Sequence, residues 1–311
     1  MNYYFAPLHG ITDYIYRNIV WKHFPCWDKL YAPFIQPNER PTIVPKEYQD
    51  ICPENNSGIP TVPQILTCDA QGFIRVAKIL EDIGYKEINL NLGCPANTVV
   101  SKGKGSAMLK DTNALNHFFD TIFQCEWNSK ITVKTRLGFT DDDDFEDLLK
   151  VYCRYPIEEL IIHPRFRSDW YNGNPRLDEF CKTFSLDVLP FKVCYNGNIY
   201  TTSDVSNILD KFPFLKSIMC GRGALSNPSL IRELKGGNAM TLEEFIAFHD
   251  DIFNTYMSVM PRERNLINKM MQMWTYWSTY WKPDKELLNE LRRCVSVKEY
   301  TSVIWHIYES L

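Results

Sequence analysis

One cysteine of this 311-residue chain stands in a sequence that could present its side chain for chemistry. Cys94 lies in Gly93-Cys94-Pro95, directly after an apolar run, and glycine and proline together favour a sharp turn there. A thiol with an ordinary pKa of about 8.5 is mostly protonated at neutral pH and can donate a proton. The nearby Lys102 and Lys104 could instead lower that pKa and favour a thiolate nucleophile. The residues alone leave both roles open.

Three basic side chains follow at the ends of two later β-type runs. Lys134 and Arg136 are two residues apart, so on a strand they point to the same face. His163 ends the next run and precedes Pro164-Arg165. Cations at such positions could stabilise an anionic reduced flavin, but Lys134 could equally form a Schiff base with a carbonyl substrate. The pattern does not separate these two chemistries.

Glycine-containing turns follow the last two β-type runs. They are Asn196-Gly197-Asn198 and Gly221-Arg222-Gly223. Glycine lets backbone N–H groups approach an anion, Arg222 adds a charged donor, and a short helix after Asn227-Pro228 offers its N-terminus. We therefore predict a phosphate site formed by the two turns.

These side chains can meet only if the runs that carry them are parallel strands of one sheet. Eight β-type runs alternate with amphipathic stretches, at Tyr3–Ala6, Leu30–Ile35, Val62–Leu66, Glu87–Leu92, Ile131–Arg136, Glu159–His163, Phe191–Tyr195 and Ser217–Cys220. Several are apolar at consecutive positions, as in strands covered on both faces. Their number and spacing predict a (β/α)8 TIM barrel, in which all strands end at one rim. The alternative, an open doubly wound sheet, would normally need fewer strands for this length.

The β-type runs stop after Gly236-Gly237. The remaining residues form amphipathic helical stretches, two of which begin with capping boxes at Thr241 and Ser296. This pattern is typical of a small helical bundle. We therefore predict a catalytic barrel over residues 1–237 and a helical domain over residues 238–311.

Composition excludes several classes of protein. With 45% hydrophobic and 23% charged residues the chain is ordinary globular protein, and no uncharged run is long enough to cross a membrane. The ten cysteines are scattered without a CxxC pair or a His-rich cluster, and no export signal is evident. We therefore expect reduced thiols in the cytoplasm and no metal site. The net charge of −4 means that a polyanion would have to be met by a local basic patch.

Several motifs resemble, in the same order, those of the tRNA-dihydrouridine synthase family. They are Ala6–Asp13, Ile88–Ala96, Ser101–Ala107, Val133–Gly138, His163–Arg165, Asn196–Ile199 and Gly221–Leu225. The resemblance runs through the whole predicted barrel, and the helical tail is similar in size and type to the C-terminal domain of that family. The segment around Cys94 is the most specific of these motifs.

This resemblance implies an enzyme with flavin mononucleotide (FMN) that reduces the C5–C6 double bond of a uridine in tRNA. NADPH or NADH reduces the flavin, reduced flavin N5 gives a hydride to C6 of the uracil, and Cys94 protonates C5. The FMN ligands implied are Pro7, Leu8, Gln64, Lys134, His163, Asn196, Asn198, Gly221 and Arg222. The residues implied to contact the uridine or the rest of the tRNA are Asn91, Lys102, Lys104, Arg136 and Arg165.

Two other functions stay open at the level of the sequence. One is a Schiff-base aldolase or lyase that uses Lys134 on a sugar phosphate, and the other is a catalytically idle tRNA-binding barrel. We expect a monomer. The tail from residue 238 has 8 Lys and Arg against 10 Asp and Glu, so tRNA contacts there would depend on local cations. These are Arg262, Arg264 and Lys269 on one predicted helix and Arg292, Arg293 and Lys298 near another.

Overall fold

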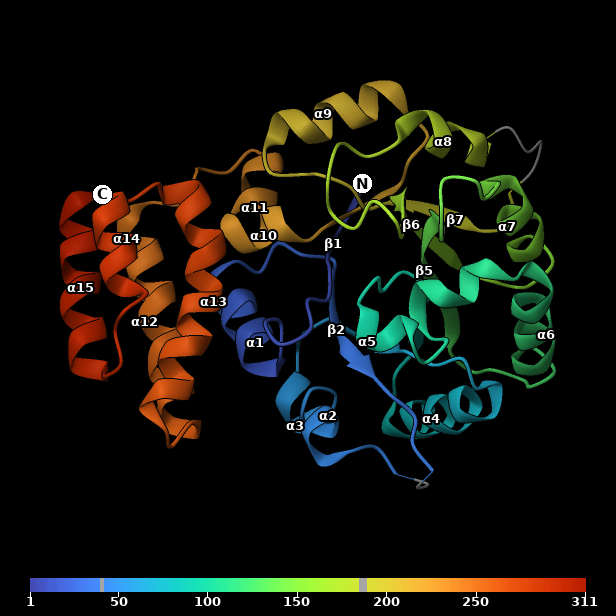
Figure 1. Ribbon diagram of the computed structural model, residues 1–311, viewed down its shortest axis with the longest axis horizontal. Helices are drawn as coiled ribbons and strands as arrows, with labels where there is room; N and C mark the ends of the chain where they lie inside the picture. The colour runs from blue at the N-terminus through green and yellow to red at the C-terminus, as the bar shows by residue number, and fades with distance from the viewer. Residues whose placement is uncertain (40–41, 185–188) are drawn as a thin grey trace.

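Eight parallel strands close into a barrel in the computed structural model, which describes residues 1–39, 42–184 and 189–311 (Figure 1). The strands are β1 (Asn2–Phe5), β2 (Lys29–Ile35), β3 (Thr61–Ile65), β4 (Glu87–Asn91), β5 (Lys130–Gly138), β6 (Glu159–Phe166), β7 (Lys192–Tyr195) and β8 (Ser217–Cys220). Each strand pairs with the next, and β8 pairs with β1. The predicted (β/α)8 barrel and its eight strands are therefore confirmed.

Helices surround the barrel, and all but the first of the longer ones were predictable from their apolar period. They are α1 (Tyr14–His23), α4 (Ala70–Ile83), α6 (Thr112–Ile122), α7 (Phe145–Tyr152) and α9 (Thr202–Lys211). Short helices lie in the loops: α2 (Pro45–Gln49), α3 (Pro53–Asn56), α5 (Asn97–Val100), α8 (Leu177–Cys181), α10 (Arg222–Ser226) and α11 (Leu230–Leu234), with 3-10 turns η1 (Gly105–Lys110) and η2 (Lys182–Phe184). Most of these short helices were not predicted, because one or two turns show no amphipathic period.

Four further helices form a bundle beside the barrel (Figure 1). They are α12 (Leu242–Val259), α13 (Glu263–Trp281), α14 (Lys285–Leu291) and α15 (Val297–Ser310). Both predicted capping boxes are present, at Thr241 and Ser296. Trp274 and Trp277 are buried in the bundle, so the tryptophan stripe of α13 is core. Within the described residues, no helix combines the length and the apolar character needed to cross a membrane.

An ion pair between a buried lysine and a half-buried aspartate joins the helical bundle to the barrel. Asp13, which caps the N-terminus of α1, accepts hydrogen bonds from Lys269 Nζ at 2.8 Å and from the hydroxyl of Tyr256. Lys269 also donates to the carbonyl oxygen of Gly10 at 2.8 Å. The prediction that Lys269 is a surface cation for tRNA was therefore wrong, because its ammonium is buried between the two parts of the fold. Arg262, which directly precedes the same helix, α13, is exposed.

The end of the barrel opposite the predicted catalytic rim holds a second polar network. It is built at the first residues of the even-numbered strands, Lys29, Glu87, Glu159 and Ser217. Alternate strands contribute to one layer inside such a barrel, which explains why these four meet. Lys29 Nζ lies 2.6 Å from Glu87 and 3.4 Å from Glu159. Glu159 also accepts hydrogen bonds from Ser217 and from Tyr4, the latter at 3.1 Å.

Replacing Glu159 by glutamine should destabilise the protein by about 2 kcal/mol, because one buried oxygen becomes a donor that faces other donors. The change is measured as the free energy of unfolding in urea. Glu158→Gln is the matched control, since Glu158 is the adjacent residue but pairs with Lys130 and Lys192 near the surface. Glu158→Gln should lower the free energy of unfolding by less than about 1 kcal/mol. Equal losses for the two variants would show that the buried network does not stabilise the barrel.

Candidate functional site

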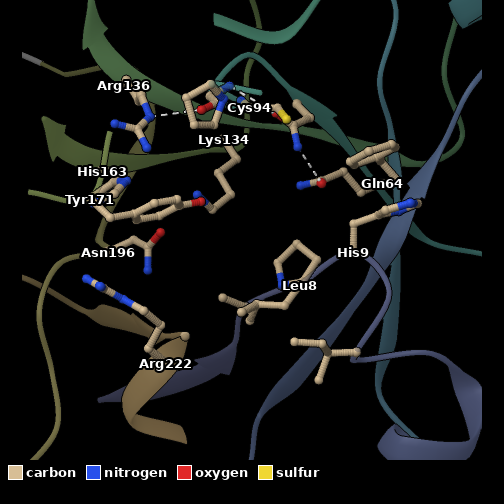
Figure 2. Close-up of a pocket in the computed structure, with 18 of the residues that line it drawn as sticks. Leu8, His9, Gln64, Cys94, Lys134, Arg136, His163, Tyr171, Asn196 and Arg222 are labelled. Carbon is tan, nitrogen blue, oxygen red and sulfur yellow. Dashed lines mark hydrogen bonds between the residues drawn. The ribbon is translucent and has the colours of Figure 1, made fainter. Parts of the chain in front are cut away.

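A pocket of about 400 Å³ opens where the strands end (Figure 2). The structure brings together in its wall eleven residues singled out from the sequence: Pro7, Leu8, Gln64, Asn91, Cys94, Lys134, Arg136, His163, Asn196, Gly221 and Arg222. They come from seven strands or the loops that follow them, so the barrel gathers residues more than 200 positions apart. Their individual roles stay predictions.

Four other predicted residues lie outside this wall. Arg165 is buried behind it and donates to His163 Nε2 at 2.8 Å and to Asn198 Oδ1 at 3.2 Å. Asn198 Oδ1 also accepts from Arg222 Nη2 at 3.0 Å. Asn198 therefore orients two guanidinium groups. Lys102 and Lys104 lie on the loop after α5, where Lys102 is exposed and Lys104 is half-buried.

The Cys94 thiol is half-buried at the edge of the pocket. The N–H groups of Gly93 and Cys94 both donate to Asn91 Oδ1, at 3.0 and 2.9 Å, which bends the chain sharply after β4. Burial raises the pKa of the Cys94 thiol, and the opposing effect of Lys134 is smaller. The thiol is thus protonated at neutral pH. This state favours the proton donor over the thiolate nucleophile.

The pocket wall beside Cys94 is positively charged. Burial, and then the charge of Arg136, lowers the pKa of Lys134 to about 8, and its ammonium has no hydrogen-bond or ion-pair partner among the described residues. Burial and the neighbouring cations hold the pKa of His163 well below its usual range, so the ring is neutral. Since Arg165 can only donate to His163 Nε2, the ring proton is on Nδ1. No Asp or Glu lines the described part of this pocket, which therefore suits an anionic ligand.

Glycines shape the end of the pocket near Arg222. A methyl group at Gly221 would lie 3.5 Å from Ala6 Cβ and 3.9 Å from Leu8 Cδ1, both in the pocket wall, so it would occupy space that a ligand could use. A side chain at Gly223 would collide with the carbonyl oxygen of Ile199. The two predicted turns after β7 and β8 are thus packed closely together beside a guanidinium group.

Four aromatic residues of the pocket were not singled out from the sequence. His9 and Phe34 stack with ring centroids 4.6 Å apart. Tyr171 lies with its ring 5.3 Å from the Arg136 guanidinium and 5.2 Å from that of Arg222. Tyr276 reaches the pocket from α13 of the helical bundle. No local pattern marks Tyr276, because only the docking of the bundle brings it to the barrel.

Comparison with known proteins gives consistent matches. Residues 4–308 match the family model described as "Dihydrouridine synthase (Dus)". A probable tRNA-dihydrouridine synthase of Rickettsia bellii is 29% identical over 234 residues, which cover 75% of this chain and 70% of that protein. A tRNA-dihydrouridine(16) synthase of Shewanella oneidensis is 27% identical, with 96% of each chain covered. The structure of morphinone reductase superposes with a TM-score of 0.53 at 11% identity, over 77% of this chain and 87% of that one, a likeness of fold.

Proposed function

This chain belongs to the dihydrouridine synthase family, and on that premise we propose that it reduces uridines of tRNA to 5,6-dihydrouridine with FMN as cofactor. The observation that carries the proposal is a juxtaposition. A protonated thiol at Cys94 shares one pocket with the unpaired ammonium of Lys134 and with the anion-binding end at Arg222. An aldolase would also use a lysine of lowered pKa, but family membership does not support that alternative.

The donors of the pocket fit FMN. We propose that Asn196, Gly221 and Arg222 hold its phosphate, with Asn198 orienting the guanidinium. Lys134, His163 Nδ1–H and the free N–H of Gln64 would bind the ring system, and Pro7 and Leu8 would give it an apolar contact. When bound, FMN supplies the hydride for C6 of the uracil and is restored by NADPH or NADH.

Two side chains of the pocket, Cys94 and Asn91, act on the uracil in the proposed reaction. Cys94 donates its Sγ–H proton to C5 as the hydride arrives at C6, so the ring gains two hydrogens and the thiolate is later reprotonated from solvent. Asn91 keeps one Nδ2–H that its hydrogen bonds within the protein do not use, and this group can hold a uracil carbonyl. The uridine must leave its stack to enter the pocket.

We propose that Lys102 and Lys104 contact phosphates around the extruded uridine, since they follow Cys94 on the rim. Binding should then weaken steeply with salt. Arg136 and Arg165 are buried and donate to backbone carbonyls, including those of Phe166 and Gly173, so we propose that they shape the pocket. We propose that the chain acts as a monomer.

Lys134 gives a prediction for the pH dependence of cofactor binding. Its pKa of about 8 should rise when the hydrogen-bond acceptors of the flavin ring bind beside it, so binding takes up a proton above that pH. The Kd for FMN should be constant up to about pH 8 and should then increase by up to about tenfold per pH unit. Titrations followed by flavin fluorescence between pH 7 and 9.5 test this. Lys134→Met should remove the dependence, whereas Lys130→Met, at the exposed start of the same strand, should retain it.

The proposed function can be tested by measuring dihydrouridine in tRNA treated with the protein. The purified chain, loaded with FMN and supplied with NADPH, is incubated with unmodified tRNA, and dihydrouridine is measured by mass spectrometry of the digested RNA. A gain of two hydrogens on uridine is the expected result. No such product, together with borohydride trapping of a sugar phosphate on Lys134, would identify a Schiff-base enzyme instead.

A further inference from the structure

Every backbone polar group of the Gly93-Cys94 dipeptide is bonded to a neighbouring residue. Its two N–H groups donate to Asn91 Oδ1. The carbonyl oxygen of Gly93 accepts from Arg136 Nε at 2.9 Å. The carbonyl oxygen of Cys94 accepts from the hydroxyl of Ser106 at 2.9 Å and from its N–H at 3.1 Å. The position of the thiol therefore depends on the groups that hold this turn.

Asn91 is itself the end of a row of buried amides that crosses the barrel. Asn91 Nδ2 donates to Gln64 Oε1 at 2.7 Å, and Gln64 Nε2 donates to Asn89 Oδ1 at 2.8 Å. Asn89 Nδ2 then donates to the hydroxyl of Thr132 at 2.9 Å. Gln64, Asn89 and Thr132 are completely buried. The row links β5, β4 and β3 to the turn of Cys94.

The direction of this row is fixed at the end near Cys94. Backbone N–H groups can only donate, so Asn91 must turn its oxygen toward them and its nitrogen toward Gln64. Gln64 must then present its oxygen to Asn91 and its nitrogen to Asn89. Each amide therefore has one orientation that satisfies both neighbours, and a break at Asn89 frees Gln64 to rotate.

We propose that Asn89 is a positioning residue of the reaction, which acts on Cys94 through Gln64 and Asn91. Asn89 is not in the pocket wall and touches neither predicted substrate nor cofactor, yet it fixes the side chain that supports the turn. Figure 2 shows Gln64 and Cys94 on the same side of the pocket. The assignment rests on the proposed function for its effect on turnover, but not for its effect on the thiol.

Asn89→Leu tests the assignment, because leucine has a similar size and no hydrogen-bonding group. With saturating FMN, kcat for tRNA reduction should fall about tenfold while KM for tRNA changes less than about twofold, since the phosphate contacts that dominate tRNA binding are unchanged. Asn89→Asp should restore most of the rate, because a carboxylate still accepts from Gln64 and the Thr132 hydroxyl can turn to donate. Thr132→Val, one link further away, should act in the same direction if the leucine variant does not fold.

A second readout is independent of catalysis. Alkylation of Cys94 by iodoacetamide, followed by peptide mass spectrometry, should be several-fold faster in Asn89→Leu, since a loosened turn exposes the thiol. Thr135→Val is the matched control: Thr135 is as buried as Thr132 and lies on the same strand, but its hydroxyl bonds Tyr152 at 2.9 Å.

Alkylation and kcat in Asn89→Leu that equal those of Thr135→Val would overturn the proposal. Faster alkylation in Asn89→Leu, with no tRNA reduction by any form of the protein, would keep the positioning role and reject the proposed function.

Discussion

Replacement of Cys94 by alanine should lower the rate of uridine reduction by at least about a hundredfold, the usual contribution of a positioned acid. Alanine cannot protonate C5, and water reaches a half-buried position poorly. Reduction of bound FMN by NADPH should proceed at the normal rate, because the thiol takes no part in it. Stopped-flow absorbance measures the flavin step, and mass spectrometry of the tRNA measures the product.

Cys68→Ala is the control for this prediction. Cys68 is an exposed cysteine whose thiol lies 3.5 Å from the carbonyl oxygen of Lys102, on the loop next to the catalytic turn. Its removal should leave the rate of tRNA reduction within about twofold, as for other surface substitutions. If the two alanine variants were equally active, the assignment of Cys94 as the acid would be refuted.

Replacement of Arg222 by alanine should weaken FMN binding roughly 30- to 150-fold, because a charge-assisted hydrogen bond to phosphate contributes about 2–3 kcal/mol. Arg222 is already held by Asn198 and lies 5.2 Å from the ring of Tyr171 and 5.9 Å from that of Tyr200, so little freedom is lost when it binds an anion. Titration of the apoprotein with FMN, followed by quenching of flavin fluorescence, gives the Kd.

The same strand provides the control for Arg222. Lys216 is exposed just before β8, at the opposite end of the strand from Arg222. Lys216→Ala removes the same charge but should leave the Kd for FMN within about twofold. A similar loss of affinity in both variants would mean that overall charge, and not the turn after β8, governs binding.

Most of the residues that line the pocket could be predicted from the sequence because the relevant signals are local. An apolar run followed by glycine and proline marks both a strand end and the presented side chain, as around Cys94. Once eight such runs indicate a closed barrel, their ends must share one rim. The order of the β-type runs in the sequence was therefore enough to predict that the side chains at their ends lie close together.

The errors and omissions concern contacts between distant parts of the chain. Lys269 has the sequence environment of a solvated helix cation, and its partner Asp13 is 256 residues away. Tyr276 reaches the pocket through the same docking of the helical bundle. Arg136 and Arg165 could be placed at strand ends, but that backbone carbonyls occupy several of their donors is visible only in three dimensions.

One helix, α13, is hydrogen-bonded to the loop after β1 through Lys269 and also supplies Tyr276 to the pocket wall. Because Lys269 and Tyr276 are on one helix, a tilt of the helical bundle would also move the loop after β1 and the pocket entrance. Chimeras that exchange this segment between relatives should therefore inherit an altered entrance, and grafting would need to transfer the β1–α1 loop together with α13. The barrel and the helical bundle are therefore not independent modules where α13 contacts the loop between β1 and α1.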